Sequence, residues 1–300
     1  MAGVRARLLV VLLVAALAVP GRAEAWGFVG HFLIMERAIA LLPAELRPLF
    51  EKHRAKVVER IIDPDTWRAA GFAEEEPNHF LDLDWEGYGK EPFGELPRDY
   101  TAAVAKFGRA RILDNGTVPW RVEEMFGNLQ RAFQDYGRRG EFGQNDILHF
   151  SAWLAHYVSD AIQPFHGVIN YDGQLTRQNG VHARFESTLV ERYMSELVLT
   201  PKALPPIRAP RDFIFERLIE DTRLAPGILK ADLDALGTRD VYDDQYFEAF
   251  FRSTRPVLER RLSDSIAAVA AAIAGAWEAA GRPPVPVSPA PQPPRRRARP

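Results

Sequence analysis

Apolar residues recur at intervals of three and four along most of the chain, which is the spacing that places them on one face of an α-helix. Two of the clearest runs are HFLIMERAIALL (31–42) and AELRPLFEKHRAKVVERII (44–62). Similar runs cover about 98–114, 119–138, 145–163, 182–198, 211–223 and 241–279. No segment shows a convincing alternation of apolar and polar residues, as a half-buried β-strand would. The pattern predicts an all-α fold, a single-domain multi-helix bundle.

One long internal segment departs from this periodicity. Between 71 and 97 the sequence is rich in Gly, Pro and acidic residues. Long irregular segments inside a compact domain are uncommon, and those that occur tend to carry function. We therefore expect this segment to contribute to a functional site.

The two ends of the chain differ from the helical body. Arg5 and Arg7 precede twelve apolar residues (8–19), and Ala-Glu-Ala follows at 23–25, which is the layout of a signal peptide. About 20 apolar residues are needed to span a bilayer, so an uncleaved membrane anchor is the alternative reading. We expect removal of 1–25 and a secreted or periplasmic protein. Residues 26–281 then form the helical domain, and the Pro- and Arg-rich segment 282–300 is predicted to be disordered.

Composition narrows the chemistry available to this domain. The chain has no cysteine, which excludes disulfides, thiolate nucleophiles and Cys-type zinc sites. Its net charge is −2, and subtracting the charged residues of 1–25 and the five arginines of 282–300 leaves about −9 for 26–281. An acidic body argues against a broad nucleic-acid groove, which needs a basic stripe. Bound divalent cations would offset much of this charge.

Histidines and carboxylates are paired in three segments, and in two of them the spacing is four residues. His156 and Asp160 lie four apart in AHYVSDAIQPFH (155–166), and His182 and Glu186 lie four apart in VHARFE (181–186). Residues four apart project from the same face of a helix, so both can reach one ion about 2.0–2.2 Å from each ligand atom. Imidazole and carboxylate together suit zinc, and a carboxylate can bridge two ions. A single such pair is typical of a surface salt bridge, but three segments together predict a metal centre.

The third segment contains two candidate carboxylates. Asp65 lies fourteen residues before His79, at the borders of the irregular segment, and Asp63 competes with it as a ligand. The spacing to His79 favours Asp65. His149 lies seven residues before His156 and is interpreted as a core residue or as a neighbour of the ligands. An alternative remains, in which the histidines are incidental to a helical interaction protein.

These residues resemble, in order and spacing, the ligands of the zinc-dependent phospholipase C and fungal single-strand-specific nuclease superfamily. The resemblance covers 26–186 and centres on the motif HYxxDxxQPFH. The residues that carry it are Trp26, His31, Asp65, His79, His156, Asp160, His166, His182 and Glu186. It implies a cleft that holds three zinc ions.

The resemblance also implies which residues bind which ion. One ion would be bound by Asp65, His79, His156 and Asp160, and Asp160 would bridge it to a second ion. The second ion would be bound by His31 and by the α-amino nitrogen and carbonyl oxygen of Trp26, which becomes the N-terminus after cleavage. The third ion would be bound by His166, His182 and Glu186. The same ligands could instead bind zinc only to brace the bundle.

The activity implied is hydrolysis of a phosphoric ester of the phospholipase C type, in which a metal-bridging hydroxide attacks phosphorus. Asp65 would orient or deprotonate the nucleophile. Arg68 would stabilise charge on the phosphoryl oxygens, unless it only pairs with the nearby glutamates.

The sequence leaves the substrate open between a phospholipid and a nucleic-acid phosphodiester. The choline-binding positions of the lipase branch correspond to Val29, Thr66 and Glu76, of which only Glu76 could attract a cation. The single-strand-specific nuclease, a 3′-nucleotidase, is the runner-up, and it implies substrate binding by Phe80 and Asp82. A second alternative is a non-catalytic zinc-binding envelope protein. We expect a monomer without a stable protein partner, with at most transient contact with a membrane surface.

Overall fold

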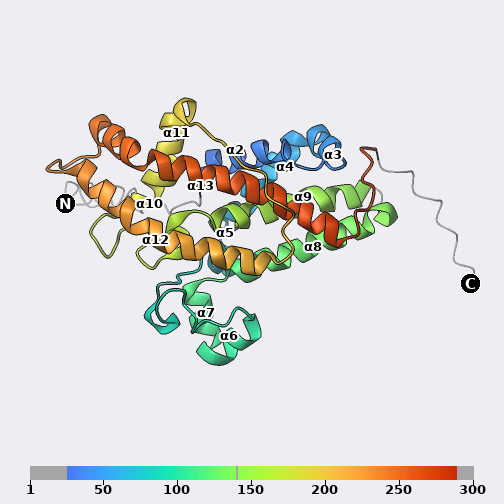
Figure 1. Ribbon diagram of the computed structural model, residues 1–300, viewed down its shortest axis with the longest axis horizontal. Helices are drawn as coiled ribbons and strands as arrows, with labels where there is room; N and C mark the ends of the chain where they lie inside the picture. Colours follow the sequence, from blue (N-terminus) through green and yellow to red (C-terminus); the bar gives the residue numbers. More distant parts are fainter. Residues whose placement is uncertain (1–25, 140, 289–300) are drawn as a thin grey trace, which may run out of the picture.

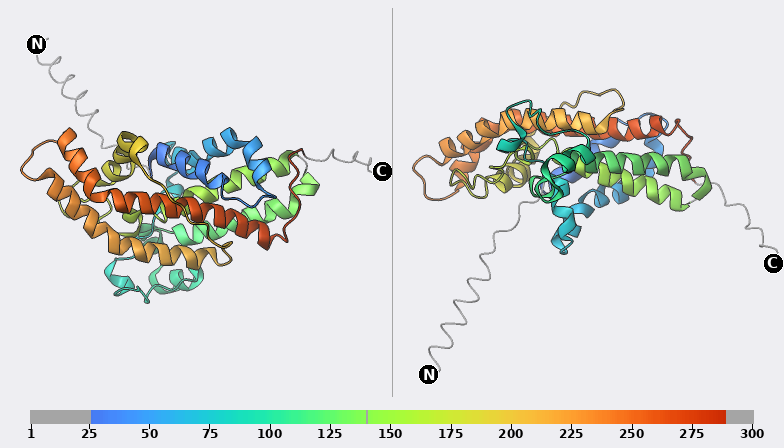
Figure 2. Two further views of the ribbon diagram at one scale, coloured as in Figure 1. Left: turned by 45° about the horizontal axis from the view of Figure 1, so that its top comes forward. Right: turned by 90° about the horizontal axis from the view of Figure 1, so that it is seen from below.

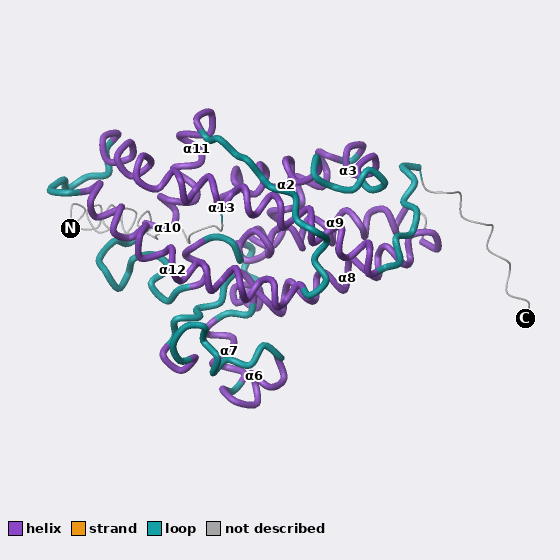
Figure 3. Tube along the Cα trace, viewed as in Figure 1, coloured by secondary structure: helices purple, strands orange, loops and turns teal. Residues whose placement is uncertain are grey.

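The computed structural model describes residues 26–139 and 141–288, and every regular element among them is a helix. The predicted all-α multi-helix fold is thereby confirmed (Figures 1 and 3). The longest elements run lengthwise through the molecule: α8 (Val118–Arg139), α9 (Glu141–Asp160), α12 (Pro210–Leu236) and α13 (Asp244–Ala279). The predicted signal peptide, 1–25, lies outside the described residues, and so do 289–300.

The core is organised around α13. Its C-terminal half is buried without interruption from Ser265 to Trp277, and most of these residues are alanines. A helix that is apolar on all sides is typically enclosed by its neighbours. Here α2 (Gly27–Ile39), α8, α9 and α12 all pack against α13. This arrangement holds the histidine-bearing helices α2 and α9 against a common support.

Short elements complete the surroundings of α9. They are α5 (Asp63–Ala69), the 3₁₀ segments η2 (Ala73–His79) and η4 (Pro164–Gly167), α10 (Val181–Ala183) and the π-helical turn η5 (Arg184–Thr188). Two backbone hydrogen bonds join the irregular segment to η4, from Leu81 N to His166 O (2.9 Å) and from Leu83 N to Gly167 O (3.1 Å). They bring the chain after His79 alongside His166.

Several predicted helices are interrupted in the structure. Region 44–62 is divided at His53 into α3 (Arg47–Lys52) and α4 (Arg54–Glu59), followed by η1 (Arg60–Ile62). Region 98–114 is divided at Gly108, whose φ of 81° no helix allows, into α6 (Tyr100–Phe107) and α7 (Arg109–Asn115). Region 182–198 consists of α10, η5, α11 (Leu189–Tyr193) and η6 (Met194–Glu196). Apolar spacing alone does not reveal such breaks.

One predicted helix is too short. The expected run 211–223 continues as α12 to Leu236, through Pro226 and Gly227. The residues beyond the proline are still amphipathic, and Ile228, Ala231 and Ala235 are buried. Their burial offsets the backbone hydrogen bond that the proline removes.

The irregular segment 71–97 leads into a lobe at one side of the bundle. It contains η2 and η3 (Glu86–Tyr88), and Trp85 and Tyr88 pack edge-on against Phe107 of α6. The lobe with α6 and α7 lies at the bottom of Figure 1 and of the left view of Figure 2. An aromatic cluster therefore packs the chain that follows His79 against α6.

The first residues of the segment predicted to be disordered contact the bundle. Val285 is buried, Tyr136 Oη donates to Pro286 O (2.6 Å), and Gln144 Nε2 donates to Val287 O (3.1 Å). The proline-rich composition therefore predicts disorder too early, because this stretch packs on α8 and α9. No helix among the described residues has both the length and the apolar character needed to cross a membrane.

A close backbone contact gives a stability test. Gly275 of α13 lies under the connection to α12, and a Cβ at this position would be 2.0 Å from Ile207 O. Gly275→Ala should therefore destabilise the fold by about 1–3 kcal/mol, although alanine favours helices. Gly227 in α12 has open space around its Cα, so Gly227→Ala should stabilise by about 0.5–1 kcal/mol. Urea unfolding measures both, and a stabilised Gly275→Ala would contradict the packing.

Candidate metal centre

Eight of the predicted ligands lie together in the interior. They come from α2, α5, η2, α9 with η4, and α10 with η5, and all are buried: His31, Asp65, His79, His156, Asp160, His166, His182 and Glu186. Their side chains form three groups with metal-ligating atoms close together. The helical fold thus brings together residues separated by more than a hundred positions.

The first group has the dimensions of a tetrahedral site. Asp160 Oδ2 lies 3.0 Å from His79 Nδ1 and 3.2 Å from His156 Nε2. The two ring nitrogens are 3.1 Å apart. Asp65 Oδ1 lies 3.7 Å from His79 Nδ1 and 4.0 Å from His156 Nε2. Ligands about 2.0–2.2 Å from a tetrahedral zinc are separated by about 3.3–3.6 Å, so these four atoms can surround one ion.

The second group consists of His31, Asp65 and His156, and it shares His156 with the first. His31 Nε2 lies 3.3 Å from Asp160 Oδ1 and 4.0 Å from Asp65 Oδ2. The two oxygens of Asp160 thus face different groups. This is the placement that a carboxylate needs in order to bridge two ions.

The third group comes from the end of α9 and the next helical turn. His182 Nε2 lies 2.8 Å and His166 Nε2 lies 4.0 Å from Glu186 Oε2. Glu186 is in the π-helical turn η5, yet it remains next to His182. π-helical turns are rare and occur frequently at functional sites.

Several of the ligand atoms lack hydrogen-bond partners among the described residues. Despite their short separations, buried atoms in all three groups are left unpaired: His31 Nε2, Asp65 Oδ2, Asp160 Oδ1, His182 Nε2 and Glu186 Oε1. A buried polar atom without a partner costs about 1–3 kcal/mol, more when charged. Lone pairs that converge on a point between them are what a metal ion requires. Nitrogen and oxygen donors in these numbers fit zinc.

Neighbouring groups orient two of the rings. Ser159 Oγ donates to the carbonyls of its own helix, and it lies 3.1 Å from His31 Nδ1, so it accepts the proton of that nitrogen. His166 Nδ1 donates to His79 O at 2.6 Å. In both rings Nε2 is left unprotonated toward the other ligands, as partners around metal sites commonly arrange.

Burial sets the protonation of the third group. It lowers the pKa of His166 and of His182 to about 4, so both rings are neutral and can act as ligands at neutral pH. Burial raises the pKa of Glu186 well above its ordinary value, against the opposing effect of His166. A divalent cation would reverse this effect by stabilising the carboxylate.

The buried carboxylate of Asp160 lies next to histidines of the first two groups. Burial opposes ionisation of Asp160, but the charge and hydrogen bond of His156, with the neighbouring rings of His31 and His79, hold its pKa well below the ordinary value. Burial likewise opposes charge on His156, whose pKa is nevertheless raised by Asp160 and Asp65. A divalent cation bound here would stabilise the same carboxylate.

Trp26 lies beside the third group. Its backbone nitrogen donates to Glu186 Oε2 (3.0 Å), and its indole donates to Ser159 O (2.7 Å). Gly27 has a φ of +51°, and a Cβ there would lie 2.5 Å from Ser187 Oγ. Glycine therefore allows the chain to press Trp26 against η5. The resemblance implies that the Trp26 nitrogen binds the same ion as His31 once it is an α-amine. In the full-length chain this nitrogen is an amide, and it donates to Glu186 of the third group.

Of the predicted catalytic and substrate-binding residues, Arg68 contacts the ligand Asp65 and Phe80 follows the ligand His79. Arg68 Nη2 donates to Asp65 Oδ1 (3.1 Å), and its Nε lies 3.8 Å from Glu76 Oε2. Phe80 is partly buried directly after His79. Asp82 is buried, and its Oδ1 has no hydrogen-bond partner among the described residues. Burial and the nearby Asp84 raise the pKa of Asp82 to about 8.

The two competing candidates lie elsewhere. Asp63 Oδ2 accepts a hydrogen bond from the Trp153 indole (3.0 Å), while Asp65 lies among the histidines. His149 is stacked on Trp153, with ring centroids 5.8 Å apart, and it belongs to none of the three groups.

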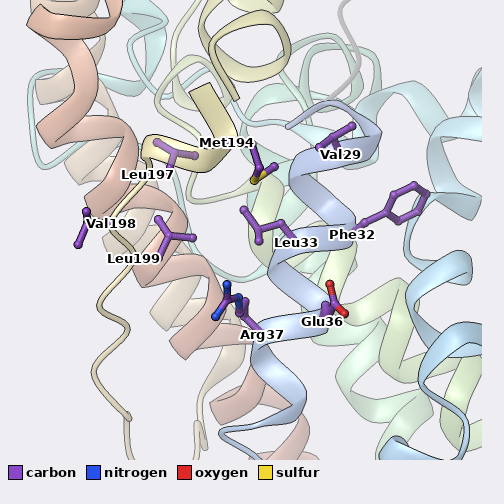
Figure 4. A pocket seen from close by; sticks show the side chains of 9 residues that line it. All are labelled: Val29, Phe32, Leu33, Glu36, Arg37, Met194, Leu197, Val198 and Leu199. Atoms are coloured by element: carbon purple, nitrogen blue, oxygen red, sulfur yellow. The ribbon is translucent and has the colours of Figure 1, made fainter. Parts of the chain in front are cut away.

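A surface groove of about 670 Å³ lies on the face of α2 away from His31, between Leu33 and Leu199, and has no histidine in its lining (Figure 4).

Sequence reasoning missed several residues that support the ligands. Gln163 Nε2 donates to Glu186 Oε2 (2.6 Å), Ser159 orients His31, and Tyr157 contacts His79 edge-on. All three lie inside the HYxxDxxQPFH segment. The signal in the sequence that could have identified them is their position between the predicted ligands.

No protein-family model matches the chain, and a search of curated proteins finds no significant match. The functional assignment therefore rests on these residues and their geometry.

The shared position of Asp160 gives a metal-content test. Asp160→Ala should lower the zinc content of the purified protein by about two ions, because both oxygens of this carboxylate face ligand groups. His149→Ala, on the same helix, should retain the wild-type content. Mass-spectrometric metal analysis measures both. Equal losses in the two variants would contradict the bridging role.

The buried Asp82 gives a test of pH dependence. Its pKa is raised from 3.8 to about 8, so the folded state keeps a proton that the unfolded state releases over this range. The stability of the wild type relative to Asp82→Asn should fall by up to about 1.4 kcal/mol per pH unit between these values. Replacing the exposed Asp114 by asparagine is the control, and should reproduce the wild-type profile. Urea unfolding from pH 5 to 9 measures the difference, and parallel profiles for wild type and Asp82→Asn would contradict a buried neutral carboxyl.

Proposed function

We propose that this chain is an exported zinc-dependent hydrolase of phosphoric esters, of the phospholipase C type. The observation that carries the proposal is the placement of Asp160, whose two oxygens face two ligand groups, with a third group at the end of the same helix. Paired ions bridged by a carboxylate are a recurrent arrangement in enzymes that cleave phosphate esters. Export is proposed from the sequence of 1–25.

The ligands divide as follows. His79, His156, Asp65 and Asp160 would hold one ion, and Asp160 with His31 would hold a second. His166, His182 and Glu186 would hold a third. Zinc, when bound, supplies a water activated near neutral pH and positive charge for the phosphoryl oxygens.

Two residues at this centre would act on the substrate and the attacking water. Asp65 Oδ2 has no hydrogen-bond partner among the described residues, so it can orient the water and accept its proton. Arg68 binds the other oxygen of Asp65, and its side chain is 10% exposed. Its guanidinium is thus held at the border of the ligand cluster. There it would stabilise negative charge on a phosphoryl oxygen as the ester bond breaks.

Asp82 supports the nuclease as the second candidate. A buried carboxyl with a pKa of about 8 is protonated at neutral pH, so it can donate one hydrogen bond and accept another. The edge of a nucleobase presents donors and acceptors in this combination. Phe80 could stack on the base, and such stacking is worth about 1–3 kcal/mol. The quaternary ammonium of a choline headgroup can neither donate nor accept such hydrogen bonds.

A substrate panel tests the proposal. The zinc-loaded protein beginning at Trp26 should hydrolyse bis-p-nitrophenyl phosphate, and phosphatidylcholine and single-stranded DNA then separate the two candidates. Asp160→Ala should abolish turnover, whereas Arg68→Ala should lower kcat by about 10²-fold, because Arg68 is not a metal ligand. Equal losses would contradict these roles. A zinc-loaded protein that turns over none of the three substrates would support the non-catalytic alternative.

A further inference from the structure

His79 differs from the other histidines of the centre in the nitrogen that it presents. His79 turns Nδ1 toward Asp160 and His156. The other four rings turn Nε2 toward the ligand groups: His31, His156, His166 and His182. A neutral imidazole carries one proton, and the partner of one nitrogen decides which nitrogen stays free to bind a metal. His79 therefore needs an acceptor on its Nε2 side.

Glu75 is the residue that faces this nitrogen. Its Oε1 lies 3.7 Å from His79 Nε2. Both residues belong to η2, four positions apart. Glu75 is 8% exposed, so little water competes for the contact. The separation exceeds hydrogen-bond length, and a movement of about 0.8 Å would close it.

The Glu75 carboxylate is itself held in place from two other elements. Tyr157 Oη of α9 donates to Oε1, and Arg121 Nη2 of α8 donates to Oε2 (3.3 Å). Asn78 Nδ2 also donates to Oε2 (3.3 Å). Arg121 binds Tyr157 Oη at 3.1 Å and lies over the tyrosine ring. The donors come from outside the ligand cluster, so one side of the carboxylate remains directed at His79.

We propose that Glu75 is a positioning residue that accepts the Nε2 proton of His79 and thereby directs Nδ1 to the metal. Tyr157 and Arg121 fix the carboxylate for this task. The inference rests on the proposed zinc centre, to which it adds the group that orients its one Nδ1 ligand. An acceptor of this kind also makes the imidazole a stronger ligand, and its loss commonly weakens metal affinity by about 10- to 100-fold.

A matched pair of variants tests this role. Glu75→Gln keeps the shape of the side chain but removes its charge. Glu74→Gln removes the same charge from an exposed neighbour in the same turn. Competition with a fluorescent zinc chelator should show one site weakened by about 10- to 100-fold in Glu75→Gln, and no change in Glu74→Gln.

A second readout separates positioning from a general structural role. In the zinc-loaded wild type, the Nε2 proton of His79 should give a downfield NMR signal that exchanges slowly, because it is bonded to a carboxylate. The signal should move upfield in Glu75→Gln. Tyr157→Phe retains the charge of Glu75 and should show a smaller change in the same direction. It also provides the measurement if Glu75→Gln does not fold.

The outcomes distinguish this inference from the proposed function. A wild-type protein that binds no zinc overturns both. A wild type that binds three ions, with unchanged zinc affinity and an unchanged His79 signal in Glu75→Gln, overturns the role of Glu75 alone. Weakened affinity without movement of the His79 signal assigns Glu75 a structural role and likewise contradicts the proposal.

Discussion

The arrangement of the candidate metal centre depends on one buried carboxylate, that of Asp160. It is the last residue of α9, where the helix dipole disfavours negative charge, and the last turn of that helix has no basic residue. Burial adds a further cost. Imidazoles on three sides keep the group ionised, and His31 and His79 come from segments far away in sequence. A charge placed against both the dipole and the solvent is expected where a cation binds, and structural stability alone does not explain it.

The rest of the fold supplies rigid positions around that carboxylate. The continuously buried half of α13 supports α2 and α9 from one side. On the other side, Arg184 Nη2 pairs with Asp232 Oδ1 of α12 at 2.9 Å, and both residues are buried. This pair ties the π-helical turn that carries Glu186 to a long helix. Ligands on short, irregular elements are thus fixed by contacts with the longest ones.

The sequence was informative where a signal is local. Apolar spacing predicted the helices, and the four-residue intervals in HYxxDxxQPFH and VHARFE predicted ligand pairs that the fold does bring together. Prediction from the sequence failed where contacts between distant segments determine the structure. α12 continues through Pro226 because apolar residues beyond it are buried, and Val285 packs on the bundle although prolines surround it. The supporting residues Glu75 and Ser159 are ordinary polar residues whose roles depend on what the fold places next to them.

The metal ligands and the residues around them would contribute differently to substrate recognition. Phospholipids and nucleic acids present the same phosphodiester, so ligands that would activate water and neutralise phosphoryl oxygens cannot tell them apart. Selectivity must come from groups that contact the rest of the substrate. Around this centre those groups are Asp82, partly buried Phe80 and Tyr171, whose half-exposed ring lies 6.2 Å from that of His182. A neutral carboxyl such as that of Asp82 can donate one hydrogen bond and accept another, whereas a quaternary ammonium is attracted by negative charge. These surrounding residues, and not the metal ligands, would therefore decide between a phospholipid and a nucleic-acid phosphodiester in the proposed function.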